Sequence, residues 1–233
     1  MLRMLRPLPF ALALAALSIF ATGCGSSSAK FRLAYVVPDG GAIDVLVDGK
    51  NVAPGLSFDS ATGYLSVASG SRHVQVFAAG TTTSPYFDST VSLSSGIAYT
   101  TVGTGSAVLK TVTAPLFTDN NAAPTSGNAE LRVIQASATG LGSANGAVDI
   151  YVTSPGGGIS GSPSIASVAY PTASTYLNVP AGTYDILVTP AGIQAIDLRF
   201  SNASFAAGKI YTYVIFDAQV NQISQSPLVL NDN

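Results

Sequence analysis

The sequence predicts an all-β protein built from two similar antiparallel β-sandwiches in tandem, and three observations lead to this fold class. Short segments rich in Val, Ile, Thr and Tyr, residues that suit pleated strands, are separated by turn residues at regular intervals. No segment beyond the N-terminal leader has the apolar period of a helix. One pattern of strands and turns also occurs twice along the 233 residues.

The chain opens with a segment that resembles a secretory signal peptide, residues 1–23. Arg3 and Arg6 supply a positive start, and an apolar run follows before Cys24. A transmembrane anchor is the alternative, but the 16 residues of the run 8–23 fall short of the roughly 20 that span a bilayer. We therefore expect this segment to be cleaved during export.

Cys24, the single cysteine, stands where a bacterial lipobox would place it, because Ala21-Thr22-Gly23-Cys24 resembles that motif. The resemblance implies lipidation of Cys24, with residues 24–29 as a flexible tether. Gly25, by resemblance to sorted bacterial lipoproteins, favours the outer membrane. The alternative is an ordinary signal peptide that leaves a free thiol.

The remainder contains an internal repeat. The segment from Tyr64 to Gly70 recurs from Tyr176 to Gly182 at an offset of 112 residues, and the same offset matches Pro115-Leu116 with Pro227-Leu228. Upstream the offset falls to 105 for Asp44 and Asp149, and to 100 for Arg32 and Arg132. The prediction is a first repeat at 30–118, a polar linker at 119–128 and a second repeat at 129–233.

Each repeat is expected to contain about seven short strands, as in immunoglobulin-like or transthyretin-like sandwiches. In the first repeat the alternation of apolar residues predicts strands at 31–37, 43–48, 63–68, 73–78, 86–93, 97–102 and 107–113. The clearest counterparts in the second repeat are 130–136, 148–153, 183–189 and 210–216.

The charge content excludes several classes of function. The chain has 10 basic and 12 acidic residues, a net charge of −2, and without Arg3 and Arg6 it has 8 and 12, a net charge of −4. A nucleic-acid partner is therefore not expected, since it requires a basic surface. One His and one Cys cannot supply a four-ligand zinc site.

We expect no catalytic residues, no cofactor and no metal, and so no enzyme. The single histidine, His73, has Asp185 as its counterpart in the second repeat, and a surface position is the simpler interpretation. The glycine-rich loop 140–146 precedes a strand rather than the helix that a dinucleotide site requires. Calcium remains an alternative, because Asp39, Asp44 and Asp48 lie within ten residues.

The repeated polar residues favour structural roles. Asp44 and Asp149 lie between apolar residues of a strand, so each carboxylate is expected to accept hydrogen bonds from turn amides or a tyrosine hydroxyl. The recurring tyrosines are expected in the core or at corners: Tyr64, Tyr176, Tyr99 and Tyr211. Tyr86-Phe87, aligned with Leu198-Arg199, is either strand core or an exposed contact for a ligand.

Two of these motifs resemble the DUF4397 domains, a family of unknown molecular function. The run from Ala42 to Gly49 is similar to the family's "VDVYVDG" core, and the segment from Tyr176 to Thr183 is similar to its "YLTVPAGTY" segment. Residues 33–39 depart from the family pattern. The resemblance implies an exported or lipid-anchored bacterial protein with tandem domains, and it supplies no catalytic residue.

Together these features predict a protein lipid-anchored to the cell envelope, with a non-enzymatic binding or structural role. Its expected partners are the membrane, through the anchor, and an envelope protein or glycan. A surface adhesin or carbohydrate-binding module is one alternative, although the chain lacks Trp. A subunit of an envelope assembly that pairs through a sheet edge is another.

The first test concerns Cys24. Cells that express the wild-type chain are expected to incorporate labelled palmitate into it, and the Cys24→Ala variant is expected to incorporate none, because the thiol is the acylated group. The measurement is autoradiography of the purified chains. A soluble, unlabelled wild-type protein would refute lipidation.

Overall fold

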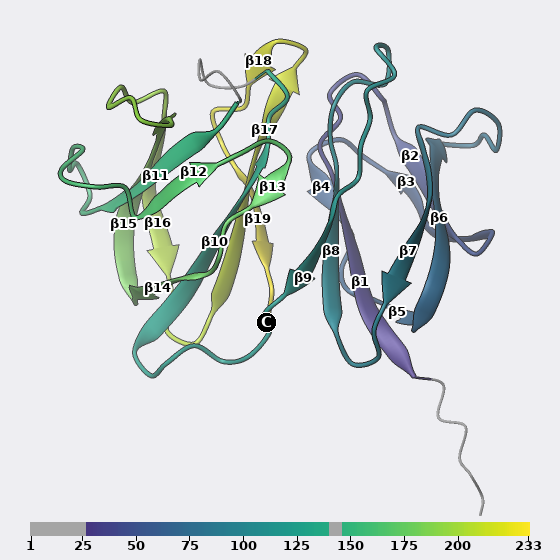
Figure 1. Ribbon diagram of the computed structural model, residues 1–233, viewed down its shortest axis with the longest axis horizontal. Helices are drawn as coiled ribbons and strands as arrows, with labels where there is room; N and C mark the ends of the chain where they lie inside the picture. Colours follow the sequence, from purple (N-terminus) through teal and green to yellow (C-terminus); the bar gives the residue numbers. More distant parts are fainter. Residues whose placement is uncertain (1–26, 140–145) are drawn as a thin grey trace, which may run out of the picture.

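The computed structural model describes residues 27–139 and 146–233, and they form four β-sheets stacked as two sandwiches (Figure 1). All the elements in these residues are strands, which confirms the all-β fold class. In the same residues no helix is long and apolar enough to cross a membrane. Cys24 and the leader lie outside the described residues.

The first sandwich contains β1–β9. Its inner sheet consists of β4 (Ser60–Ala61), β1 (Ser28–Tyr35), β8 (Ala98–Gly103) and β9 (Leu116–Asp119), with β5 (Leu65–Ala68) also paired to β1. Its outer sheet has the order β3 (Lys50–Leu56), β2 (Ile43–Val47), β6 (Gly70–Ala78) and β7 (Phe87–Leu93). Asp48 and Gly49, both with positive φ, form the tight turn that joins β2 to β3.

The second sandwich repeats this plan with β10–β19. Its inner sheet has the order β13 (Thr172–Ala173), β10 (Asn128–Ala136), β17 (Ile210–Gln219) and β18 (Gln222–Ile223), with β14 (Leu177–Pro180) paired to β10 and β19 (Leu228–Asn231) paired to β17. Its outer sheet has the order β12 (Ile165–Val168), β11 (Val148–Thr153), β15 (Gly182–Pro190) and β16 (Leu198–Phe205).

One strand pair in each sandwich is parallel. β1 pairs parallel to β8, and β10 pairs parallel to β17, whereas the other paired strands run antiparallel. The first strand of each repeat thus lies in the middle of a mixed sheet and hydrogen-bonds on both edges. Since Ser28 and Ala29 pair with Ala68 and Val67 of β5, β1 begins inside the segment predicted as a tether.

Two details of the sequence interpretation are wrong. Residues 107–113 do not form a strand: 107–110 are a turn flanked by the positive φ of Gly105 and Lys110, and Thr113 makes only an isolated bridge to Thr104. The last strand of the repeat is β9 instead. The repeat offset also changes before the end of the chain. Tyr99 and Tyr211 are counterparts at an offset of 112. Thr118 pairs with Tyr99 and Asn231 pairs with Tyr211, so Thr118 and Asn231 are counterparts at an offset of 113.

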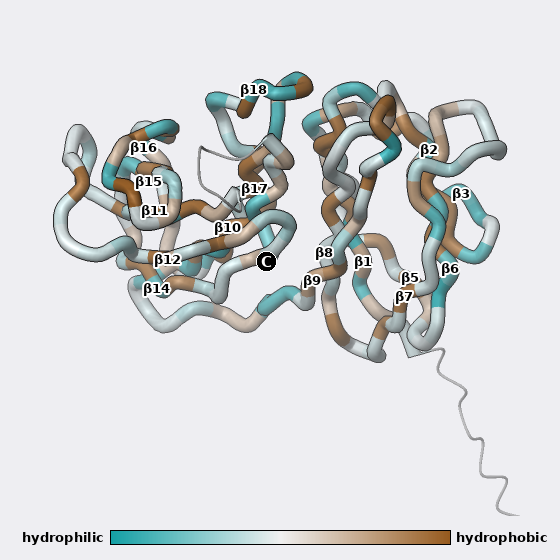
Figure 2. The backbone as a smooth tube through the Cα atoms, turned by 45° about the horizontal axis from the view of Figure 1, so that its top comes forward, coloured by the Kyte–Doolittle hydropathy of each residue, from teal (hydrophilic) through white to brown (hydrophobic). Residues whose placement is uncertain are grey.

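The apolar residues form three clusters. One lies inside each sandwich, between its inner and outer sheets, and the brown segments of Figure 2 mark these cores. The third lies between the two inner sheets, and we call this contact the seam. It contains Ala34, Val36, Val102, Ile134, Ala136, Val214, Phe216 and Leu230. The two sandwiches therefore share a core, which Phe58 of the first extends by an edge-to-face contact with Phe216, 5.8 Å between ring centroids.

Four buried charges cross the seam in a closed ring. The Arg32 guanidinium contacts Asp232 at 2.6 Å, and Arg132 contacts Asp119 at 2.6 Å. Longer contacts complete the ring, 3.4 Å from Arg132 to Asp232 and 3.9 Å from Arg32 to Asp119. All four side chains are at most 4% exposed. We call these residues the charge ring.

Neutral hydroxyl groups supply further hydrogen bonds to the carboxylates of the ring, and equivalent residues of the two repeats provide them. Thr100 donates to Asp119 at 2.6 Å, and Thr212 donates to Asp232 at 2.8 Å. The hydroxyls of Tyr64 and Tyr176 donate to the same two carboxylates, at 2.6 and 2.8 Å. The rings of these tyrosines also lie beneath Arg32 and Arg132, 4.5 and 4.8 Å from the guanidinium carbons. The seam thus has an approximate two-fold symmetry.

Removal of one carboxylate should cost much of the stability. Asp232→Asn leaves two buried arginines with one acidic partner, and loss of one member of a buried ion pair typically costs about 3–5 kcal/mol. We expect the urea midpoint of unfolding to fall strongly. The matched control is Asp88→Asn, which breaks the exposed contact with His73, and its midpoint should remain nearly that of the wild type. Equal midpoints for the two variants would contradict this role for the ring.

Candidate binding site

Both sandwiches present loops at the end of the molecule away from Ser28. β1 begins at Ser28, where Gly96 donates its backbone amide to the Ser28 carbonyl. β1, β6 and β8 end at the opposite side, and so do β10 and β17 of the second sandwich (Figure 1). We call this side the distal end. Loops from both repeats meet there across the seam.

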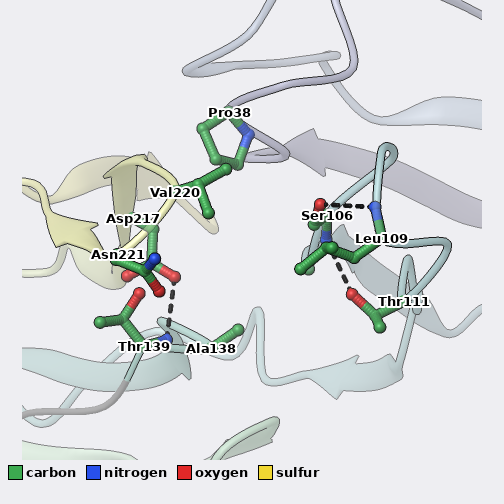
Figure 3. A pocket seen from close by; sticks show the side chains of 10 residues that line it. Pro38, Ser106, Leu109, Thr111, Ala138, Thr139, Asp217, Val220 and Asn221 are labelled. Carbon is green, nitrogen blue, oxygen red and sulfur yellow. Dashed lines mark hydrogen bonds between the residues drawn. The ribbon is translucent and has the colours of Figure 1, made fainter.

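A pocket of about 140 Å³ opens at the distal end of the seam. Pro38, Ser106 and Leu109 of the first repeat line it, and Thr139, Asp217, Val220 and Asn221 of the second repeat face them (Figure 3). We call it the seam pocket. Because each repeat supplies one side, the pocket depends on the docking of the two sandwiches.

Two aspartates hold the loops around the seam pocket. Asp39 accepts hydrogen bonds from the Ser106 hydroxyl and from the Ala107 amide. Desolvation of Asp39 opposes ionisation, but these hydrogen bonds outweigh it and hold the pKa of the carboxyl below its ordinary value. In the second repeat, Asp217 accepts from the Ser137 hydroxyl and the Thr139 amide.

The rim of the seam pocket exposes apolar side chains. Val108 is 76% exposed, Leu109 66% and Val220 46%. We call these three residues the distal patch. Gly105 permits the turn that presents Val108 and Leu109, because a Cβ there would lie 2.5 Å from the Thr111 carbonyl oxygen. Grouped apolar exposure on a rigid end is typical of a contact surface.

A second pocket, of about 350 Å³, lies within the first repeat at the same end. It opens between the β6–β7 loop, which supplies Ser84, Pro85 and Tyr86, and the β8–β9 loop, which supplies Ala107, Lys110 and Val112. We call it the Tyr86 pocket. The Tyr86 hydroxyl donates to the Gly40 carbonyl at 3.1 Å, so the β1–β2 loop fixes the position of the aromatic ring.

The expected role of the paired aspartates in turns is confirmed. Asp44 accepts hydrogen bonds from the amides of Gly80 and Gly55, at 2.9 and 2.8 Å. Asp149 accepts equivalent bonds from Gly192 and Ser167, at 2.8 and 2.7 Å. The Gly80 and Gly55 amides lower the pKa of the Asp44 carboxyl. Each aspartate therefore joins two loops to its central strand.

The acidic residues considered for calcium each serve a different turn. Asp39 binds Ser106 and Ala107, Asp44 binds two glycine amides, and Asp48 binds the His73 amide and Arg72. Within residues 27–139 and 146–233, no three His, Cys, Asp or Glu side chains are grouped as metal ligands.

His73 lies exposed on β6, and its Nε2 atom is 2.6 Å from Asp88. Its counterpart Asp185 instead binds Arg199 at 2.6 Å. The expected surface position of His73 is confirmed. Of the glycine-rich loop, residues 140–145 lie outside the described part of the chain, and so does Cys24.

The expected corner position is confirmed for Tyr99 and Tyr211. The hydroxyls of Tyr99 and Tyr211 accept hydrogen bonds from the amides of Ser94 and Ala206, five residues upstream, as in a tyrosine corner. Tyr64 and Tyr176 instead complete the charge ring.

The alignment of Tyr86-Phe87 with Leu198-Arg199 is wrong by one residue. The Tyr86 and Asp197 amides donate to the equivalent carbonyls of Val76 and Val188, so Asp197 is the counterpart of Tyr86. An irregularity in the β15–β16 pairing absorbs the shift. Tyr86 and Phe87 both pack against the core of the first sandwich, as the core interpretation expects, and Tyr86 in addition lines a pocket.

Sequence reasoning missed both pockets. A signal is present at residues 105–110, where three consecutive apolar residues, 107–109, lie between Ser106 and Lys110. The same residues also favour a strand, so the sequence does not distinguish an exposed turn there. The seam pocket had no local signal, since its lining comes from four separate stretches of the chain, at Pro38, 105–111, 138–139 and 217–221.

Comparison with known proteins identifies the family. The model of the domain of unknown function DUF4397 matches residues 29–151 and again residues 140–233. No curated protein matches the chain.

Solved structures give distant likenesses. The Bacillus anthracis TIE protein is 12% identical, with a TM-score of 0.28, over 82% of this chain and 34% of its own, so this chain spans about a third of its length. A protein from Bacteroides uniformis proposed to act in cell adhesion is 12% identical, with a TM-score of 0.29, over 89% and 100%. A streptococcal virulence factor that binds alpha-glucan is 13% identical, with a TM-score of 0.26, over 84% and 96%. At these TM-scores the likenesses carry no functional argument.

The paired aspartates provide a test of the loop architecture. Asp44→Ala and Asp149→Ala are each expected to lower the melting temperature, because each change leaves two loop amides without their acceptor. For the buried Asp149 the loss should be about 1–3 kcal/mol. Circular dichroism melting measures both, and unchanged melting of both variants would contradict the assignment.

Proposed function

The chain belongs to the DUF4397 family, and from this premise we propose that it is a lipid-anchored cell-envelope protein that acts by binding, without catalysis. The observation that carries the proposal is the position of the seam pocket and the distal patch. Both repeats contribute to them, and they lie at the end opposite Ser28, where the chain continues toward Cys24. If Cys24 carries the lipid, the distal end faces away from the membrane.

The rigidity of this end supports a binding role. The seam core and the charge ring fix the two sandwiches to each other, and Asp39 and Asp217 fix the loops. A preorganised surface loses little conformational entropy when it binds, so a modest apolar patch can contribute usefully to affinity.

The proposed location is the outer membrane, after cleavage of residues 1–23. The sequence pattern at residues 21–25 supports this location. A structural role in the envelope would use the same anchor, but it would leave the exposed distal patch without a use.

A surface adhesin or carbohydrate-binding module is the second candidate, and the Tyr86 pocket favours it. This pocket combines an aromatic ring with polar groups and lies beside the distal patch, which shares the β8–β9 loop with it. Assembly through a sheet edge has no comparable feature in its support.

The test compares the two ends of the molecule. The double variant Leu109→Lys, Val220→Lys places charges on the distal patch, and we expect it to lose most binding of the purified full chain to isolated envelopes of the producing bacterium. Co-sedimentation with the envelopes, with detergent diluted below its critical micelle concentration, measures this binding. The charges should prevent apolar contact without disturbing the fold, since both side chains are exposed.

The matched control is Ile97→Lys, which adds a charge at an exposed apolar position beside Ser28. It should bind like the wild type. Equal loss in both variants, or no loss in either, would refute binding through the distal end.

A further inference from the structure

We propose that the Tyr86 pocket binds an acidic saccharide, a sugar ring that carries a carboxylate, with Tyr86 against the ring and Lys110 paired to the carboxylate. The inference rests on the proposed binding function and names its ligand class. Three features of the pocket carry it: its size and place, the fixed aromatic ring and the available ammonium group.

The pocket has the size and the mixed lining that a sugar needs. Its volume of about 350 Å³ falls within the usual range of small-molecule sites. Pro85, Ala107 and Val112 supply apolar surface, and Ser84 supplies a hydroxyl. A sugar ring has an apolar C–H face and hydroxyl edges, so it matches a lining of this kind.

The aromatic ring of Tyr86 is held in position from two directions. Its amide donates to the Val76 carbonyl at 2.8 Å, and its hydroxyl donates to the Gly40 carbonyl at 3.1 Å. Gly40 must remain a glycine, because a Cβ there would lie 2.0 Å from the buried Tyr35 hydroxyl. The ring is therefore preorganised as a platform, which reduces the entropy lost on binding.

Lys110 supplies the charge. It takes a φ of +56° at the end of the turn from Ala107 to Lys110. Its ammonium group makes no hydrogen bond or ion pair within the described residues. The nearest acid in the turn network, Asp39, is occupied by Ser106 and the Ala107 amide. Because Lys110 lines the same pocket as Tyr86, its ammonium group can attract a ligand that carries a negative charge, through a charge-assisted hydrogen bond.

Within the described residues of the second repeat, no aromatic side chain occupies the position of Tyr86. The counterpart of Tyr86 is Asp197, which offers no aromatic platform and would repel a carboxylate. The proposal therefore predicts one acidic saccharide per chain, although the fold is duplicated.

The experiment is a calorimetric titration of the purified full chain in detergent at low salt. The probes are tetragalacturonic acid and its methyl ester, which have the same sugar rings but carry charged carboxylates in the acid and neutral methyl esters in the other. The wild type is expected to bind the acid about tenfold more tightly than the ester, with one site per chain. Lys110→Met should reduce binding of the acid to the level of the ester. Tyr86→Leu should weaken binding of both probes.

The control is Lys209→Met, which removes an exposed lysine from the β16–β17 turn at the end near Ser28. It should bind both probes like the wild type. Full binding of the acid by Lys110→Met, or no binding of it by the wild type, overturns the proposal. The proposed function is tested separately, by the envelope binding of the Leu109→Lys, Val220→Lys variant. If that variant loses envelope binding, the proposed function stands even when the saccharide proposal fails. If that variant keeps envelope binding, the proposed function is refuted.

Discussion

The charge ring places Arg32, Asp232, Arg132 and Asp119 in a seam from which water is largely excluded. Each arginine is bonded most closely to an aspartate from the other repeat, and its contact with the aspartate of its own repeat is longer, so the docking of the two sandwiches gives each arginine its shorter ion pair. A buried ion pair adds little net stability compared with apolar residues of the same size, but a misplaced one is costly. The ring therefore acts mainly as a constraint on register. It permits the seam core to form in one arrangement.

That arrangement determines where the binding surfaces lie. The approximate two-fold symmetry of the ring relates β1 to β10, and these two strands run in the same direction. The loops that follow them therefore emerge at the same end of the molecule. The seam pocket exists because these loops meet across the seam. The Tyr86 pocket depends on the seam less directly, since its walls belong to the first sandwich. The four buried charges of the ring thus determine how the loops of the distal end are arranged.

The sequence predicted those features that repeat within one strand and its neighbouring turn. Asp44 and Asp149 were assigned correctly because each lies in a strand whose alternation is unmistakable, and a carboxylate there requires donors. Arg32 and Arg132 were matched, but their partners were not. Asp119 fell in the predicted linker, and an offset of 112 aligned it with Asn231 in place of Asp232. One inserted residue before β19 was enough to hide half of the ring.

The two repeats differ most at positions where a substitution lowers the free energy of unfolding least. A change in the charge ring disturbs four buried groups at once, whereas a change in an exposed loop usually alters stability by less than about 0.5 kcal/mol. Tyr86 and Asp197 occupy equivalent positions at the edge of such loops, and Lys110 lies in an exposed turn. A duplicated domain can thus keep the charge ring the same on both sides of the seam while one repeat acquires a ligand pocket. The symmetry of the interior and the asymmetry of the distal end then have one physical cause, the different energetic cost of change at buried and exposed positions.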